Sequence, residues 1–173
     1  MIIWINGAFG SGKSSVAEAI NKKLSNSFVY DPEQVGYFLW DNFPDEMKRK
    51  GNFQHIDIWR EFNYKILRHI KANYDGVVIV PMTIYVKQYY NEIVGSLINE
   101  GIVIKSFILT VKKTTIINRV VQRGGVPDGW EAQHIDTCLN AFETDIPGEK
   151  INAEENSIEE IASKIILLSR CAE

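Results

Sequence analysis

The stretch GAFGSGKS at residues 7–14 constrains this chain more than any other feature, because it fits the phosphate-loop spacing of Gly, four residues, then Gly-Lys-Ser. A loop that wraps backbone N–H groups around phosphate oxygens needs residues without Cβ at its tight bends, and Gly7, Gly10 and Gly12 supply them. The apolar run IIWI precedes the loop, and residues 15–24 follow it with helical periodicity. A strand, a glycine-rich turn and a helix in this order predict a phosphate-binding site.

The last residues of the loop have expected roles of their own. Lys13 opens a helix whose N-terminal amides and positive dipole end face the anion, and its ammonium group reaches the β- and γ-phosphates. Ser14 offers a hydroxyl to Mg²⁺.

Composition excludes several classes of protein. The 173 residues fit one domain, and a formal charge of −3 with a pI near 5.7 argues against a nucleic-acid-binding or anionic-membrane surface. Cys138 and Cys171 lack metal-ligand spacing and indicate reduced thiols. No apolar segment approaches the roughly 18 residues of a membrane span. We expect a cytoplasmic protein without membrane insertion or nucleic-acid partners, and the sequence leaves its oligomeric state open.

Asp31 follows a short predicted strand at 27–30, and Pro32 then begins a helix to about residue 40. Ligands of open α/β sheets bind at the carboxyl ends of strands, so Asp31 is a candidate to face the substrate. Capping the helix is an equally good interpretation of Asp31. The two roles do not exclude each other.

The predicted substrate-binding insertion spans about residues 32–73. It contains a polar connection at 42–52 and a long helix over 56–73. Arg60, beside Trp59 on this helix, is a candidate anchor for an anionic or hydrogen-bonding substrate, although most charges on such a face are solvated surface.

Gly76–Val80 predicts a strand that is buried on both faces and ends at Pro81. Many phosphate-loop ATPases carry a second acid at such a strand end, and this chain has none, which argues against a large ATPase motor. Thr83 is a candidate to present its hydroxyl to the substrate or to a metal-bound water. A turn or helix-capping role for Thr83 is the alternative.

The region from about 119 to 135 has the layout of a lid. A predicted helix over 112–123 carries Arg119 and Arg123 four residues apart on one face, and a glycine- and proline-containing loop follows before the next helical segment. Phosphoryl transfer needs positive charge on the transferring group after water has been excluded. The two arginines are therefore candidates for that role, with ordinary helix-surface positions as the alternative.

The remaining elements complete the predicted fold. Residues 86–99 predict a helix, 102–109 a strand and 150–153 a short last strand, and Ser157 with Glu160 predicts a capping box for the final helix. Strands that alternate with helices predict an α/β, three-layer P-loop NTPase fold: a five-stranded, mostly parallel sheet with helices on both faces, kinase-like with a lid.

Four stretches resemble the tunicamycin-resistance protein family, a nucleotide-binding branch of the small P-loop kinases that include shikimate, gluconate and nucleoside monophosphate kinases. These stretches are MIIWINGAFGSGK, YDPEQVGYFL, GNFQHIDIWREF and VVIVPMT. The resemblance implies ATP and Mg²⁺ as cofactors and a small molecule as substrate. It implies that the ATP phosphates are held by Gly7, Ala8, Phe9, Gly10, Ser11, Gly12, Lys13, Ser14 and Ser15.

The same resemblance implies further roles. Ser14 with Asp31 would place Mg²⁺ or a substrate hydroxyl, Arg119 and Arg123 would clamp the γ-phosphate, and the Asn152 loop would touch adenine. Two functions stay open. One is a phosphotransferase that phosphorylates a hydroxyl of a nucleoside-like or sugar-like compound, with Asp31 as general base. The other is an ATP-dependent protein that sequesters a drug without altering it.

Overall fold

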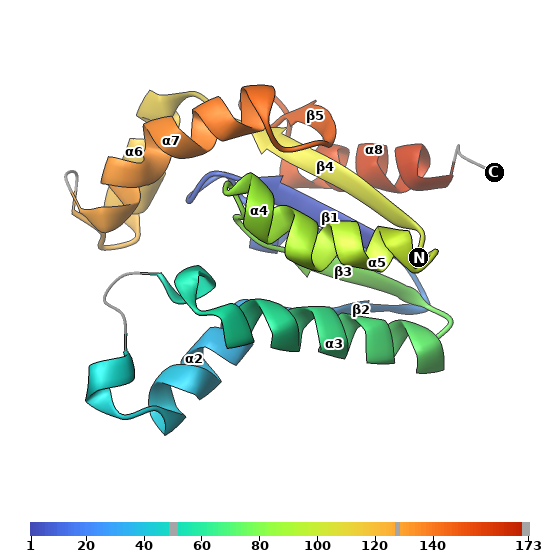
Figure 1. The fold of residues 1–173 in the computed structure, drawn as a ribbon. Helices are drawn as coiled ribbons and strands as arrows, with labels where there is room; N and C mark the ends of the chain where they lie inside the picture. The colour runs from blue at the N-terminus through green and yellow to red at the C-terminus, as the bar shows by residue number, and fades with distance from the viewer. Residues whose placement is uncertain (49–51, 127–128, 171–173) are drawn as a thin grey trace.

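A parallel sheet forms the centre of the structure (Figure 1). The described residues form five strands in the spatial order β2-β3-β1-β4-β5, and each of their four pairings is parallel, so the sheet is parallel throughout rather than mostly so. The strands are β1 (Ile2–Gly7), β2 (Ser27–Val29), β3 (Val77–Pro81), β4 (Ile104–Thr110) and β5 (Glu149–Asn152). This order gives β1 a neighbour on each side and places the phosphate loop at the middle of the sheet.

The structure is a computed structural model that describes residues 1–48, 52–126 and 129–170. Parts of the predicted connection at 42–52 and of the predicted lid at 119–135, together with Cys171, therefore lie outside the described residues. None of the helices that the described residues form combines the length and the hydropathy needed to cross a bilayer.

Helices cover both faces of the sheet. The α-helices are α1 (Lys13–Lys23), α2 (Glu33–Asn42), α3 (Asp57–Asn73), α4 (Lys87–Tyr90), α5 (Ser96–Asn99), α6 (Lys113–Gln122), α7 (Trp130–Thr144) and α8 (Ile158–Arg170). Helices α1 and α8 pack together on one face, whereas α3 packs against the α4–α5 segment on the other. Short 3₁₀ turns, η1 (Asp45–Met47) and η2 (Phe53–His55), lie between α2 and α3. The three-layer P-loop NTPase fold predicted from the sequence is confirmed.

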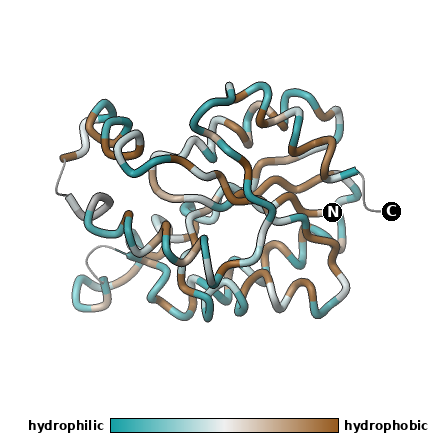
Figure 2. The backbone as a smooth tube through the Cα atoms, turned by 90° about the horizontal axis from the view of Figure 1, so that it is seen from above, coloured by the Kyte–Doolittle hydropathy of each residue, from teal (hydrophilic) through white to brown (hydrophobic). Residues whose placement is uncertain are grey.

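The core lies between these layers. Trp4, Ile79 and Phe107, from three neighbouring strands, are almost completely buried, and Figure 2 shows the hydrophobic stretches gathered along the central strands. Strands buried on both faces read as continuous apolar runs, which explains why the sequence located β1 and β3 well. The capping box of α8 also forms, because the Ser157 amide and hydroxyl donate to Glu160 Oε2 and the Glu160 amide donates back to Ser157 Oγ.

The helix predicted over 86–99 contains a π-helical turn. Helices α4 and α5 are joined without a break by η3 (Asn91–Gly95), which is wound as a π-helix. A π turn inserts one extra residue into a helix and changes the direction of the side chains that follow. The turn contains Glu92, whose carboxylate pairs with Arg60 of α3.

An aromatic cluster fixes the η2 turn against α2 and α3. The Phe53 ring lies 5.2 Å from the Trp40 ring, 6.3 Å from the Tyr37 ring and 5.3 Å from the Trp59 ring, measured between centroids. Gly36 permits this approach, because a Cβ at Gly36 would lie 2.5 Å from the Phe53 ring. The aromatic cluster therefore sets the position of the residues on either side of Phe53.

We expect Gly36→Ala to destabilise the protein by about 1–3 kcal/mol, because the added methyl group overlaps the Phe53 ring. Urea denaturation would measure the loss. Gly95→Ala is the matched control: it is also a helical glycine, but its Cβ would meet neighbours only at ordinary contact distances of 3.5 Å or more. The control should be neutral or up to about 1 kcal/mol stabilising. Equal behaviour of both variants would contradict the proposed packing.

Candidate active site

The site begins with Asn6, the residue before the phosphate loop. The Asn6 carboxamide is buried and bonds the segment after β3 twice: Nδ2 donates to the Ile84 carbonyl at 2.8 Å, and Oδ1 accepts the Ile84 N–H at 2.9 Å. The same Oδ1 accepts the Gly7 N–H at 3.0 Å. Thr83 adds a further bond, from its hydroxyl to the Gly7 carbonyl at 2.9 Å. The phosphate loop and the end of β3 are therefore held side by side.

The phosphate loop is tied internally by Lys13. Its ammonium group donates to the Gly7 carbonyl at 3.1 Å and to the Ala8 carbonyl at 3.0 Å. Gly10 and Gly12 have φ values of +80° and +97°, a left-handed conformation that glycine adopts without strain. The loop thus has the backbone conformation for which the sequence predicted glycines.

A cavity of about 330 Å³ opens beside the loop. The phosphate loop and the first turn of α1 form one wall, the face of α6 forms a second, and the segment that leads into α8 forms a third. The lining residues are Gly10, Ser11, Gly12, Ser15, Val16, Arg119, Gln122, Arg123, Ala153, Asn156, Ile158 and Ile161. Of the predicted cofactor residues, Gly10, Ser11, Gly12 and Ser15 line this cavity, whereas Gly7, Ala8, Phe9, Lys13 and Ser14 do not.

Three observations fit a bound phosphate chain. The Ser11 hydroxyl is buried and has no hydrogen-bond partner among the described residues. No side chain among the described residues caps α1, so the N–H groups of its first turn remain available as hydrogen-bond donors. A Cβ at Gly12 would meet no atom within 4 Å, so the backbone borders open space there. Oriented amides at a helix N-terminus are a binding site for anions.

Arg119 and Arg123 approach the loop from α6. Arg119 Nη1 lies 3.4 Å from the Gly10 carbonyl oxygen, and Arg123 Nε donates to the Arg119 carbonyl at 3.2 Å. Arg123 Nη2 lies so near the loop that a Cβ at Gly10 would approach it to 3.1 Å. The structure thus brings both arginines to the phosphate-loop cavity, although Arg123 is exposed, and their role at the γ-phosphate stays a prediction.

The Asn152 side chain lies away from this cavity. Asn152 Oδ1 accepts the Glu154 N–H at 2.8 Å, and Asn152 lines a different cavity of about 390 Å³ beside β4 and α7. The neighbouring Ala153 and Asn156 line the phosphate-loop cavity instead. This loop therefore lines the phosphate-loop cavity through Ala153 and Asn156 rather than Asn152, and its contact with adenine stays a prediction.

Glu154 holds this loop against α6. Its carboxylate accepts the Thr115 hydroxyl at 2.7 Å and the Lys112 N–H at 3.0 Å, and these hydrogen bonds keep the pKa of Glu154 below its ordinary value. Two walls of the cavity are thus joined by one carboxylate.

Asp31 caps α2, as one of its two predicted roles required. Oδ1 accepts the Glu33 N–H at 3.0 Å, and Oδ2 accepts the Gln34 side-chain amide at 3.0 Å. The neighbouring Tyr30 has a raised pKa. Burial of its phenol is the main cause, and the negative charge of Asp31 raises this pKa further. Each carboxylate oxygen retains a lone pair for a second interaction.

Arg60 has three partners among the described residues. It pairs with Glu92, donates from Nη1 to the Gln54 carbonyl at 2.6 Å, and lies 4.3 Å from the centroid of the Tyr89 ring. The helix-surface interpretation of Arg60 is wrong, since the residue is 9% exposed. A direct anchor role for Arg60 stays a prediction, and the contacts that the structure shows are those of a support for the η2 turn.

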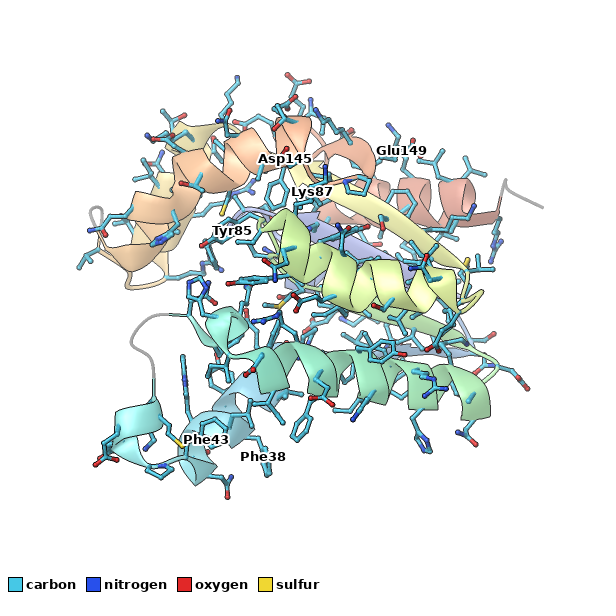
Figure 3. The ribbon with its side chains drawn as sticks, viewed as in Figure 1. Phe38, Phe43, Tyr85, Lys87, Asp145 and Glu149 are labelled. Carbon is cyan, nitrogen blue, oxygen red and sulfur yellow. The ribbon has the colours of Figure 1, made fainter. Side chains whose placement is uncertain are left out.

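Thr83 and Tyr85 belong to the segment that follows β3. The Thr83 carbonyl accepts the Gln54 side-chain amide at 2.7 Å, and its hydroxyl is engaged by Gly7. Tyr85 lies between the start of α4 and α7 (Figure 3), where its ring centroid is 6.3 Å from that of His134. Cys138 of α7 is buried nearby, and burial raises the pKa of its thiol to about 12, although Lys13 opposes the rise.

Several residues of this region were not predicted from the sequence. Asn6 and Gln54 lie in two of the stretches that resemble the tunicamycin-resistance family, but no role was predicted for them, because their contacts join segments that are far apart in the chain. Gln122 was accessible to reasoning, because it lies one helical turn after Arg119 and so shares its face.

We expect Asp31→Ala to cost about 0.5–2 kcal/mol of stability and Asp31→Asn less, because Asn retains the oxygen that accepts the Glu33 N–H. Urea denaturation would measure both losses. If Asp31→Asn kept its stability but lost function, catalysis would be separated from capping. Large, equal losses in both variants would contradict the capping geometry.

We expect the Arg60–Glu92 pair to make folding pH-dependent. Burial alone would raise the pKa of Glu92, but hydrogen bonds from Arg60 and Gln88 outweigh it and hold this pKa below its ordinary 4.5. A carboxyl group with a lowered pKa stabilises the fold above pH 4.5, and this contribution is lost as the pH falls through the lowered value. The difference in melting temperature between wild type and Glu92→Gln should therefore be large at pH 7 and shrink in acid.

Glu61→Gln is the control for that measurement, because it breaks an exposed ion pair with Lys65 on the same helix as Arg60. This variant should melt close to the wild type at pH 7. A Glu92→Gln protein as stable as wild type at pH 7 would show that the pair does not contribute.

Comparison with known proteins finds similarity in structure only. The sequence matches no protein-family model, and it matches no curated protein. The tunicamycin resistance protein of Deinococcus radiodurans is similar in structure, with a TM-score of 0.83 and 24% identity over 98% of this chain and 95% of that one.

Kinases are similar at lower scores. A gluconokinase from Sinorhizobium meliloti has a TM-score of 0.65 and 15% identity over 96% of this chain and 90% of its own. The shikimate kinase of Aquifex aeolicus has a TM-score of 0.62 and 18% identity over 97% and 95%, respectively. The chain therefore has the fold of the small P-loop kinases, with a structural resemblance to the tunicamycin resistance protein.

Proposed function

We propose that the protein is an ATP-dependent kinase of small molecules. It would transfer the γ-phosphate of ATP to a hydroxyl of a nucleoside-like or sugar-like compound, as in antibiotic resistance of the tunicamycin type. The kinase fold of its structural neighbours supports this proposal, and the structural resemblance to the tunicamycin resistance protein supports the class of acceptor.

One observation carries the proposal: Arg119 and Arg123 line the same cavity as the phosphate loop. A protein that only binds a nucleotide needs the loop and the helix N-terminus. Two guanidinium groups from a different element supply additional positive charge, which is what the transferring phosphoryl group requires in its transition state.

The step itself is an in-line displacement. The acceptor hydroxyl oxygen forms a bond to the γ-phosphorus, the bond from that phosphorus to the bridging oxygen breaks, and the bond electrons leave with ADP. Asp31 takes the hydroxyl proton in this proposal, through a lone pair that helix capping leaves available. Lys13, Arg119 and Arg123 neutralise the charge that develops on the phosphate oxygens.

The donor set suits Mg²⁺ bound chiefly through the nucleotide. The described residues contain no cluster of three or more His, Cys, Asp or Glu side chains that could hold a metal alone. Magnesium in kinases is held by one or two protein oxygens together with phosphates and water. Ser14 and Asp31 are the residues that we propose for it, and the ion would supply charge stabilisation to the phosphates.

A second function is favoured by a different observation. Both oxygens of Asp31 already accept a hydrogen bond, one from the Glu33 N–H that caps α2 and one from the Gln34 side chain, and β3 ends without an acid. A site without a dedicated base fits a protein that binds ATP and sequesters a drug unchanged. In that case, occupancy of the nucleotide cavity would gate drug binding.

Mass spectrometry separates the two functions. The purified protein is incubated with Mg-ATP and with tunicamycin, nucleosides or small sugars, and we expect one acceptor to gain the mass of a phosphoryl group. Lys13→Ala should abolish this product, because it removes the charge at the β- and γ-phosphates. Arg123→Lys, which keeps the charge but loses the planar fork, should lower the rate by at least about tenfold.

Drug binding without any modified product would favour sequestration. Product formation that persists in Lys13→Ala would contradict the assignment of the phosphate loop. Lys22→Ala, at the far end of α1 from the phosphate loop, is the control and should retain wild-type activity.

A further inference from the structure

We propose that Gln54 binds the phosphate acceptor through its side-chain carbonyl oxygen, and that the acceptor offers this oxygen a neutral hydroxyl or amide N–H. This inference rests on the proposed function, because it takes the acceptor to bind beside the phosphate loop. Gln54 belongs neither to the phosphate-loop motif nor to the lining of the phosphate-loop cavity.

The first observation is an unpaired oxygen. Gln54 is 2% exposed, and Nε2 donates to the Thr83 carbonyl at 2.7 Å, which fixes the orientation of the carboxamide. Oε1 is buried and has no hydrogen-bond partner among the described residues. Buried polar atoms are nearly always paired, so an oxygen held in place without a partner indicates a site for a ligand.

The second observation is the rigidity of the Gln54 backbone. The Asn52 side-chain oxygen accepts the Gln54 N–H at 2.9 Å, and the buried Arg60 guanidinium donates to the Gln54 carbonyl at 2.6 Å. Arg60 is held in turn by Glu92 and by the Tyr89 ring. These contacts leave the Gln54 backbone little freedom to move, so the side-chain oxygen is held at one place.

The third observation is the location. The Thr83 carbonyl accepts the Gln54 side-chain amide, and the Thr83 hydroxyl donates to the Gly7 carbonyl. The same Gly7 carbonyl also accepts a hydrogen bond from Lys13 Nζ. Two hydrogen bonds thus join Gln54 to the phosphate loop. The nucleotide cavity extends from the loop toward α6 and α8, whereas Gln54 approaches from the β3 side. This is the side left for the acceptor.

A second unpaired group lies in the same aromatic cluster. Trp40 Nε1 is buried without a hydrogen-bond partner among the described residues, and the Trp40 ring packs against Phe53, the residue before Gln54. A carboxamide oxygen only accepts hydrogen bonds, so a ligand group that meets Gln54 Oε1 must supply a hydrogen. Hydroxyls and amides supply one, whereas a carboxylate or phosphate has no hydrogen to offer Gln54.

Calorimetry with matched ligands tests this role. The probes are tunicamycin, uridine and glucose, titrated in the presence of Mg²⁺ and a non-hydrolysable ATP analogue. We expect at least one probe to bind the wild type and to bind Gln54→Met about tenfold more weakly, the magnitude of one neutral hydrogen bond. The affinity for the ATP analogue itself should stay within about twofold.

A second ligand distinguishes recognition from a structural effect. Methylation of the hydroxyl or N–H that meets Gln54 should weaken binding to the wild type but not to Gln54→Met, because the partner is already absent. Asn73→Leu removes an exposed carboxamide at the end of α3 that bonds the His69 carbonyl; it is the control and should bind all probes like the wild type. Failure of every probe to bind the wild type, or equal sensitivity of both proteins to each methylation, would overturn the assignment.

The outcomes separate this inference from the proposed function. Probe binding that depends on Gln54, without phosphoryl transfer in the mass spectrometry experiment, would refute the kinase and keep the role of Gln54. Transfer at a wild-type rate and with a wild-type KM in Gln54→Met would refute the role of Gln54 alone.

Discussion

The active region depends on one buried side chain, Asn6. Its carboxamide bonds both the N–H and the carbonyl of Ile84, a residue 78 positions away in sequence, and it also accepts the first N–H of the phosphate loop. Because Asn6 is 1% exposed, water cannot compete for these bonds. The ends of β1 and β3 are therefore fixed relative to each other, and Thr83 is brought within hydrogen-bond distance of Gly7.

The strand order places different segments of the chain on the two sides of the phosphate loop. Since β1 lies between β3 and β4, the chain leaves the carboxyl edge of the sheet in two directions from the phosphate loop. On the β4 side, the segment after β4 contributes α6 with its two arginines to the cavity. The segment after β5 contributes the loop that leads into α8. The segments on the β3 side bring Gln54 and Asp31. Nucleotide and acceptor would thus bind on opposite sides of one loop, which is the arrangement that transfer between them requires.

Several charged side chains near the phosphate loop hold other parts of the protein in position. Asp31 caps α2, Arg60 supports the η2 turn through Gln54, and Glu154 joins the loop after β5 to α6. Such groups fix the walls of the site in advance, so less ordering is left to be done when ligands bind. The neutral Gln54 oxygen is different, because its own hydrogen bond is not made within the described protein.

The sequence by itself determined the α/β class, the phosphate loop with its flanking strand and helix, and the two arginines on one helical face. These follow from local spacing and from periodicity, which act within a few residues. Only the tertiary structure decided that Asn152 turns away from the phosphate-loop cavity, that Arg60 is buried against Glu92, and that Asn6 and Gln54 are hydrogen-bonded to the segment after β3 beside the phosphate loop. Each of these rests on contacts between segments that are far apart in the chain, and the packing of the whole sheet, rather than any local pattern, sets which segments meet.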